Sequence, residues 1–218
     1  MFFVSHYLYE GAPASPYVAA GLTIPDLKRG FTRIYHRHIH NTVTPAGELL
    51  SALHEGIQRH YAADRQFHSS VWFNQQCHDF LHMMEHEGLN RRRLRLSVLA
   101  HLGVELLLEA MLVRYQTSVV DKYYDLLNCI ETSVLSKYFE RMGIPDTGQK
   151  ILTNFISFKQ RRYIYLLSEN KQVVSAMVNI YVPVTGVAIT EEETLHLLTA
   201  VNNINGQIRY TWRKVFNK

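Results

Sequence analysis

The sequence predicts an all-α protein, an irregular bundle of about seven helices. Three observations support this class. The 218 residues include only 11 glycines and 6 prolines, so few residues interrupt regular structure. Capping residues, glycines and prolines divide the chain into segments of helical length. Within these segments apolar residues recur at helical spacing, as at Leu49, Leu50, Leu53 and Ile57.

The N-terminal segment, residues 1–46, is expected to be largely irregular. Prolines punctuate it at positions 13, 16, 25 and 45. Asp26 follows the third proline and suits a turn or the start of a helix. The alternating histidines at 36, 38 and 40 fit either a short extended piece or a loop, and the pattern leaves both open.

The first long helix is predicted to begin at Thr44, which suits the N-cap, with Pro45 at the first helical position. It should run to about residue 63. A second helix over 71–87 has Ser69 or Ser70 as its cap, and Gly88 can end it.

The remaining helices are predicted over residues 91–116, 118–142 and 147–167, then to about 181, and from 190 to 215. The last begins at a capping box formed by Thr190 and Glu193. Because the chain shows neither a repeat nor a linker-like stretch, we expect a single helical domain over 1–218. Its helices within 44–117 carry the candidate site, and those within 118–218 support them.

Charge and cysteine content indicate an ordinary intracellular protein. The net charge of +4 and pI near 9.0 are too weakly basic to require a nucleic-acid partner, and the aromatic residues are not interleaved with basic ones. Two cysteines do not make a disulfide framework, so we expect a cytoplasmic location. The apolar opening lacks a basic region typical of signal peptides. The most apolar stretch, 94–113, contains ionisable groups and fits a buried helix better than a membrane span.

Two ladders of ionisable side chains step by four residues. Their members are His60, Asp64 and His68 in one and His101, Glu105 and Glu109 in the other. On helices each ladder lies on one face, and two such helices could gather imidazoles and carboxylates around a divalent metal. The alternative is a polar seam in which these groups satisfy one another or pair with arginines. A third ladder at 78, 82 and 86 has polar neighbours and is expected to be a solvated face.

Four segments, in order along the first half of the chain, resemble motifs of the acyl carrier protein phosphodiesterase family. The opening FFVSHYLY, with His6, resembles that family's Asn-Phe-Leu-Ala-His. The segment GLTIPDLKRG resembles its Gly-Asn-x-x-x-Asp-x-x-x-Gly, at Gly21, Asp26 and Gly30. GIQRHYAADRQFH resembles its Gly-Ile-x-x-His-x-x-x-Asp-x-x-x-Asp, at Gly56, Ile57, His60, Asp64 and His68. HLGVELLL resembles its Asp-x-x-x-Asp-His-Phe-Leu, at His101, Glu105 and Leu108.

The resemblance implies an HD-domain-like fold, a divalent metal, expected to be Mn²⁺, and a phosphodiester hydrolase that releases 4′-phosphopantetheine from holo acyl carrier protein. The metal ligands would be Asp26, His60, Asp64, His68, His101 and Glu105. Asp64 or Glu105 would act as general base, and His6 would protonate the leaving oxygen. The acidic carrier protein would dock on Arg91, Arg92, Arg93 and Arg95.

The chain also departs from the family pattern. His68 and His101 stand where the family has Asp, Glu105 replaces Asp, and Leu106 replaces the His that follows. Imidazole in place of carboxylate favours Zn²⁺ or Fe²⁺. These departures motivate a second hypothesis, in which the chain is a catalytically inactive helical binding module that keeps the fold.

Overall fold

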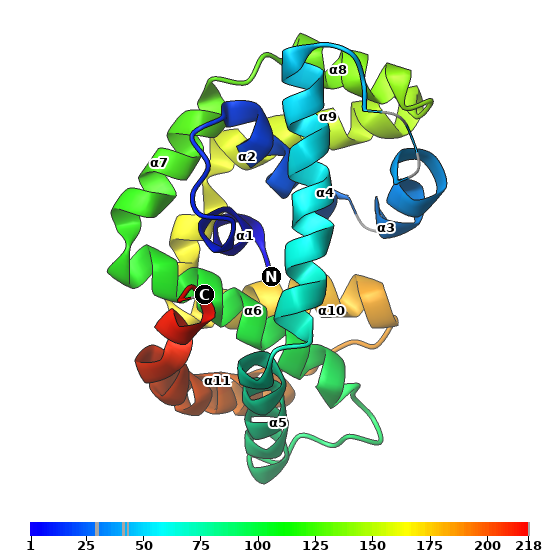
Figure 1. Cartoon of the computed structure of the whole chain (residues 1–218). Helices are drawn as coiled ribbons and strands as arrows, with labels where there is room; N and C mark the ends of the chain where they lie inside the picture. Colours follow the sequence, from blue (N-terminus) through cyan, green and yellow to red (C-terminus); the bar gives the residue numbers. More distant parts are fainter. Residues whose placement is uncertain (29–30, 41, 43, 218) are drawn as a thin grey trace. The chain divides into compact units, whose positions relative to one another are not determined.

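The computed structural model describes residues 1–28, 31–40, 42 and 44–217, and these residues form helices and no strand (Figure 1). The predicted all-α class is therefore confirmed, with more helices than the sequence indicated. Gly30 of the second motif lies outside the described residues. With short 3₁₀ and π turns labelled η, the elements are α1 (Phe3–Tyr9), α2 (Pro16–Thr23), η1 (Ile24–Leu27), α3 (Phe31–Ile34), η2 (Tyr35–Ile39), α4 (Glu48–His68), α5 (Val71–His86), α6 (Leu96–Tyr115), α7 (Thr117–Asn128), α8 (Thr132–Arg141), α9 (Pro145–Arg161), η3 (Tyr163–Ser168), α10 (Asn170–Thr185), α11 (Glu191–Thr211) and η4 (Trp212–Val215).

The chain forms two compact units, each assembled from separate stretches of sequence. The first, called here the His6 unit, comprises Phe2–Arg65 and Ser118–Tyr163. The second, the His101 unit, comprises Met1, Gln66–Thr117 and Ile164–Lys218. The sequence predicted one domain because no linker is visible, and the divisions between the units accordingly fall within α4, α7 and η3 and not in linkers.

The prediction of a largely irregular segment over 1–46 is wrong, because α1, α2, η1, α3 and η2 lie within it and two of its four prolines begin helical elements. Pro16 occupies the first turn of α2, and the Ser15 hydroxyl accepts a hydrogen bond from the Val18 N–H at 3.4 Å. Pro25 likewise lies in the first turn of η1. Proline lacks an N–H, and the first helical residues need none, so these prolines are compatible with helix starts.

Several other helix boundaries also differ from the prediction. Helix α4 continues to His68, five residues beyond its predicted end, and α6 begins at Leu96 and not at residue 91. Helix α4 begins at Glu48 because Gly47 has φ +109°, a backbone conformation incompatible with a right-handed helix. The helix expected over 118–142 is two helices, α7 and α8, separated near Glu131, whose backbone is extended. No glycine or proline in this stretch indicates the break. Ile130, which precedes the extended residue, is buried.

Glycines allow close helix packing inside each unit. In the His6 unit, Gly21 of α2 lies against Gly56 of α4, and a Cβ added to Gly56 would lie 2.3 Å from the Val18 carbonyl oxygen. In the His101 unit, a Cβ added to Gly103 of α6 would meet the Phe80 ring of α5 at 2.2 Å. Both pairs of helices therefore approach more closely than any larger residue permits.

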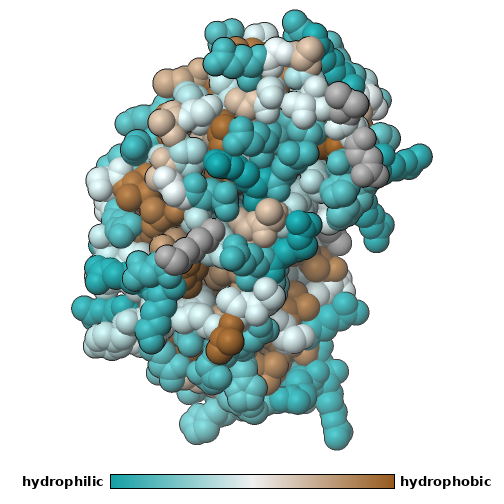
Figure 2. All heavy atoms as spheres, viewed as in Figure 1, coloured by the Kyte–Doolittle hydropathy of each residue, from teal (hydrophilic) through white to brown (hydrophobic). Residues whose placement is uncertain are grey.

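Helix α6 is the core helix of the His101 unit and packs on α5, α10 and α11. Among the described residues it is the one helix long and apolar enough to cross a bilayer. Most of it is buried by its neighbours, as in the core helix of a soluble protein, which agrees with the sequence prediction. Figure 2 shows a face on which hydrophilic residues predominate and apolar ones are scattered, an ordinary pattern for a protein surface.

A buried histidine gives the His6 unit a pH dependence. The His54 Nδ1–H lies 3.0 Å from the Tyr138 hydroxyl oxygen, and the Gln58 amide donates to His54 Nε2 at 3.1 Å, so the neutral ring is satisfied. Burial lowers the pKa of His54 below its ordinary 6.5. The unfolded chain therefore takes up a proton first as the solution is acidified.

We expect the stabilisation by neutral His54 to be complete above pH 6.5 and to be lost as pH falls through the lowered pKa of the folded state. Urea unfolding of the wild type and His54→Gln between about pH 7.5 and about pH 5 measures this dependence. The stability advantage of the wild type should shrink on acidification. A constant difference across the range would contradict the assignment.

Candidate metal centre

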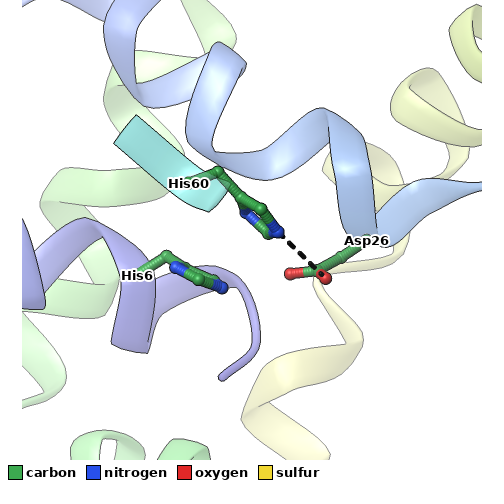
Figure 3. A group of neighbouring side chains, drawn as sticks. All are labelled: His6, Asp26 and His60. Carbon is green, nitrogen blue, oxygen red and sulfur yellow. Dashed lines mark ion pairs between the residues drawn. The ribbon is translucent and has the colours of Figure 1, made fainter. Parts of the chain in front are cut away.

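Three side chains of the His6 unit converge in a buried position and are called here the His6 group: His6 from α1, Asp26 from η1 and His60 from α4 (Figure 3). One ligand atom from each lies within 4.8 Å of the others. The imidazole rings of His6 and His60 are stacked with centroids 3.9 Å apart, and both extend toward the Asp26 carboxylate (Figure 3). His6 is fully buried and His60 is 4 % exposed.

A backbone carbonyl fixes the orientation of His60. Its Nδ1–H donates to the Leu22 carbonyl at 2.8 Å. In the neutral ring this leaves the lone pair on Nε2, which lies 3.8 Å from Asp26 Oδ1. The contact between Gly21 and Gly56 is what brings Leu22 of α2 close enough to α4 for this bond. Helix packing therefore determines which nitrogen is available as a ligand.

The separation of these atoms suits a metal ion. Nitrogen and oxygen ligands lie roughly 2.0–2.2 Å from a divalent ion such as Zn²⁺, so two ligands of one ion lie at most about 4.4 Å apart. The 3.8 Å between His60 Nε2 and Asp26 Oδ1 is within this limit. Two imidazoles and one carboxylate form a donor set for transition metals, and the described geometry needs only small adjustments to close around an ion.

Asp64 lies one helical turn after His60 on α4 and contacts His6. Its Oδ1 is 3.6 Å from His6 Nε2, and its side chain is 30 % exposed. A carboxylate in this position can orient an imidazole that binds a metal through its other nitrogen. Because it is partly exposed, Asp64 also remains the candidate general base that the sequence indicated.

A second cluster, the His101 group, belongs to the His101 unit and consists of His68, His101 and Glu105. His68 Nε2 is 2.8 Å from Glu105 Oε1, and His101 Nε2 is 3.3 Å from the same oxygen. The amino nitrogen of Met1 lies 2.5 Å from it. Glu105 is 4 % exposed, so a single buried carboxylate oxygen is surrounded by nitrogen donors.

These contacts determine the charge of Glu105. Burial by itself raises the pKa of this carboxyl group. The Met1 ammonium and the hydrogen bonds from His101 and His68 outweigh burial and hold the pKa well below its usual range. The His101 group is therefore the polar seam considered above, in which nitrogen donors satisfy a carboxylate. In the His6 group, by contrast, two acceptors face each other, His60 Nε2 and Asp26 Oδ1.

The structure thus divides the six ligands predicted from the sequence between the two units. The His6 unit holds Asp26, His60 and Asp64, and the His101 unit holds His68, His101 and Glu105. The ladder on α4 lies on one helix, yet its third member belongs to the other unit. His6, expected from the resemblance to donate a proton, lies among the candidate ligands. Glu109 of the second ladder is fully buried.

Two of the four arginines proposed for docking are engaged within the His101 unit. Arg91 pairs with Glu85, and Arg93 pairs with Glu193 at the start of α11. The third ladder, at 78, 82 and 86, is exposed on α5, as a solvated face should be.

A surface cavity of about 290 Å³ also lies in the His6 unit, and Asp26 is among the residues that line it. Other lining residues come from α9 and the turn after it, including Asn154, Arg161 and Tyr163. No motif or spacing in the sequence indicated these residues, because they are separated from the His6 group by about half the chain.

Comparison with known proteins finds no family model, no curated protein and no solved structure that matches this chain. The fold and the two clusters define an all-α protein with a candidate metal centre of two imidazoles and a carboxylate. The resemblance to the phosphodiesterase family consequently rests on the motif residues themselves.

Proposed function

We propose that the chain is a metal-dependent phosphodiester hydrolase whose ion is held by His6, Asp26 and His60. The observation that carries the proposal is the 3.8 Å approach of His60 Nε2 to Asp26 Oδ1 in a buried position beside a cavity. Two acceptors in that relation are brought together favourably by a cation. The ordered motifs at the same residues support hydrolysis of a phosphodiester as the reaction.

Each residue of the His6 unit then has a role. A bound divalent ion supplies Lewis-acid activation of water and neutralises phosphate charge. Leu22 holds His60 through its carbonyl, and Asp64 orients His6 and accepts a proton from the attacking water. In the reaction a water oxygen bonds to phosphorus, the bond from phosphorus to the alcohol oxygen breaks, and the alcohol leaves protonated by solvent. Glu105, already bound by two imidazoles, is left out of this scheme.

The substrate and setting follow from the resemblance. Holo acyl carrier protein would lose its phosphopantetheine group, and Arg92 and Arg95 are the arginines of the docking cluster for which we propose contact with the acidic carrier. The metal would be Mn²⁺ by resemblance, while two imidazole ligands also suit Zn²⁺ or Fe²⁺. We place the protein in the cytoplasm, where Cys77 and Cys129 would remain free thiols, as they are in the structure.

One observation favours the alternative of an inactive binding module. Leu106, which replaces a family His, is 4 % exposed in α6, next to a carboxylate already committed to a polar seam. Half of the six predicted ligands, namely His68, His101 and Glu105, would then serve the fold of the His101 unit. The alternative predicts no turnover with any metal.

Elemental analysis of purified protein tests the proposal. We expect about one transition-metal ion per chain in the wild type, and nearly none in His60→Ala or Asp26→Asn. His101→Ala should keep the metal, because it belongs to the other cluster. Turnover of bis(p-nitrophenyl) phosphate and of holo carrier protein should fall at least about 100-fold when the metal is lost.

Two outcomes would overturn the proposal that His6, Asp26 and His60 hold the metal ion. One is metal-free wild-type protein that also binds no added Mn²⁺, Fe²⁺ or Zn²⁺. The other is metal content that His101→Ala abolishes while His60→Ala, shown to be folded by circular dichroism, leaves it unchanged. Metal binding without turnover of either substrate would favour the binding module.

A further inference from the structure

The cavity beside Asp26 adjoins the proposed centre. Asp26 belongs both to its lining and to the His6 group. Its volume of about 290 Å³ is at the small end of ligand pockets, which are roughly 300–1,000 Å³. It therefore suits a phosphate group together with one ring-sized substituent, or the corresponding end of a longer substrate.

A guanidinium group provides recognition of an anion in this cavity. Arg161, an exposed residue in the last turn of α9, is the cationic side chain among the lining residues that the structure describes. Arginine binds phosphate oxygens through two parallel N–H groups. From the same helix, the Asn154 amide donates to the Leu27 carbonyl at 2.8 Å, which ties α9 to the turn that carries Asp26. The cation and the carboxylate are thus held on two elements that are bonded together.

An aromatic wall forms another part of the lining. The Phe3 and Phe158 rings have centroids 4.4 Å apart, and Tyr163 lies with its ring centroid 5.4 Å from that of Phe158. Phe3 and Phe158 are buried, while Tyr163 is half-buried at the cavity. Aromatic faces and edges at such spacing favour a flat apolar group over a hydrated one.

We infer that this cavity is the substrate subsite of the proposed hydrolase. Arg161 binds a phosphate oxygen, and the wall of Phe3, Phe158 and Tyr163 holds a flat apolar group esterified to the phosphate. The substrate class is therefore a phosphodiester with an aromatic or similarly flat substituent next to phosphorus. Because the pantetheine arm of a carrier protein is aliphatic and branched, such a substrate is an alternative to holo acyl carrier protein, and phenyl phosphate probes its recognition without serving as the diester itself. This inference rests on the proposed function, but its binding component can be measured without turnover.

Calorimetric titration with phenyl phosphate, inorganic phosphate and phenol, each in MnCl₂ and again in EDTA, tests the subsite. We expect phenyl phosphate to bind more tightly than the other two probes. Arg161→Met should weaken phenyl phosphate binding about tenfold, equivalent to about 1.4 kcal/mol, and Arg161→Lys should restore part of it. Tyr163→Ala should remove the preference for phenyl phosphate over inorganic phosphate while leaving phosphate affinity unchanged.

Lys150→Met is the matched control, since it removes an exposed cation from the same helix outside the cavity lining. Equal affinity of the wild type and Arg161→Met for phenyl phosphate would overturn the inference, as would no binding of that probe under either condition. Binding that depends on Arg161, without turnover of any ester, would instead leave the subsite standing and remove the hydrolase proposal.

Discussion

Replacing Gly56 with alanine is expected to destabilise the protein by about 3 kcal/mol or more, although alanine is the better helix former. The added Cβ would lie 2.3 Å from the Val18 carbonyl oxygen and 2.8 Å from the Gly21 Cα. Both are backbone atoms and cannot turn aside as a side chain would, so α2 must move away from α4. That movement would also lengthen the bond from His60 to the Leu22 carbonyl. Urea unfolding measures the stability, and metal analysis reports on His60.

Gly206→Ala provides the control, because there is open space beside Gly206 on α11 and a Cβ added there would meet no atom of another element within 4 Å. This variant should be unchanged or more stable by about 0.5–1 kcal/mol, the helix propensity difference alone. If Gly56→Ala were as stable as Gly206→Ala, the close approach of α2 and α4 would be refuted. A large loss of stability at Gly56 would also explain why glycine occupies this position in the segment that resembles Gly-Ile-x-x-His.

Replacing Glu105 with alanine is expected to cost about 3–5 kcal/mol, the usual result of removing one partner from a buried ionic cluster. The carboxylate accepts from His68 and His101 and pairs with the Met1 ammonium. The buried ammonium would lose this acceptor, whereas the two imidazoles are partly exposed and can turn to water. Glu105→Gln retains the shape and one carbonyl acceptor, so it should cost less. Chemical denaturation followed by a probe within the His101 unit measures both variants.

Glu192→Ala is a suitable control, since Glu192 is exposed in the first turn of α11 and its replacement should change stability by no more than about 0.5 kcal/mol. A loss below about 1 kcal/mol in Glu105→Ala would contradict the polar seam. Metal analysis of the same variant separates the clusters. Loss of metal from folded Glu105→Ala would assign the ion to the His101 group and remove it from the His6 group.

Local signals in the sequence were sufficient to predict the start of a helix where a capping side chain bonds within the first turn. The capping box of Thr190 and Glu193 is present at the start of α11 as predicted, and Ser70 caps α5. The start of α4 was misplaced because glycine at 47 gave no sign of its positive φ. The break between α7 and α8 was missed because residues 118–142 contain no glycine or proline to mark it. Pro16 and Pro25 were assigned to an irregular segment although they lie in the first turns of α2 and η1, while Pro45, predicted to begin a helix, precedes α4 by three residues.

The sequence by itself determined the all-α class, the helix that carries His101, Glu105 and Glu109, and the residue types able to hold a metal, because helical periodicity and capping are properties of neighbouring residues. It ended the preceding helix near residue 63, whereas α4 continues to His68 and carries the whole first ladder. Only the tertiary structure decided that the predicted ligands form two groups, that His6 joins Asp26 and His60, and that α9 supplies Arg161 to the cavity beside them. Those relations depend on how closely helices distant in sequence can pack. At Gly21 and Gly56 that closeness is set by missing side chains, which a pattern of side chains does not reveal.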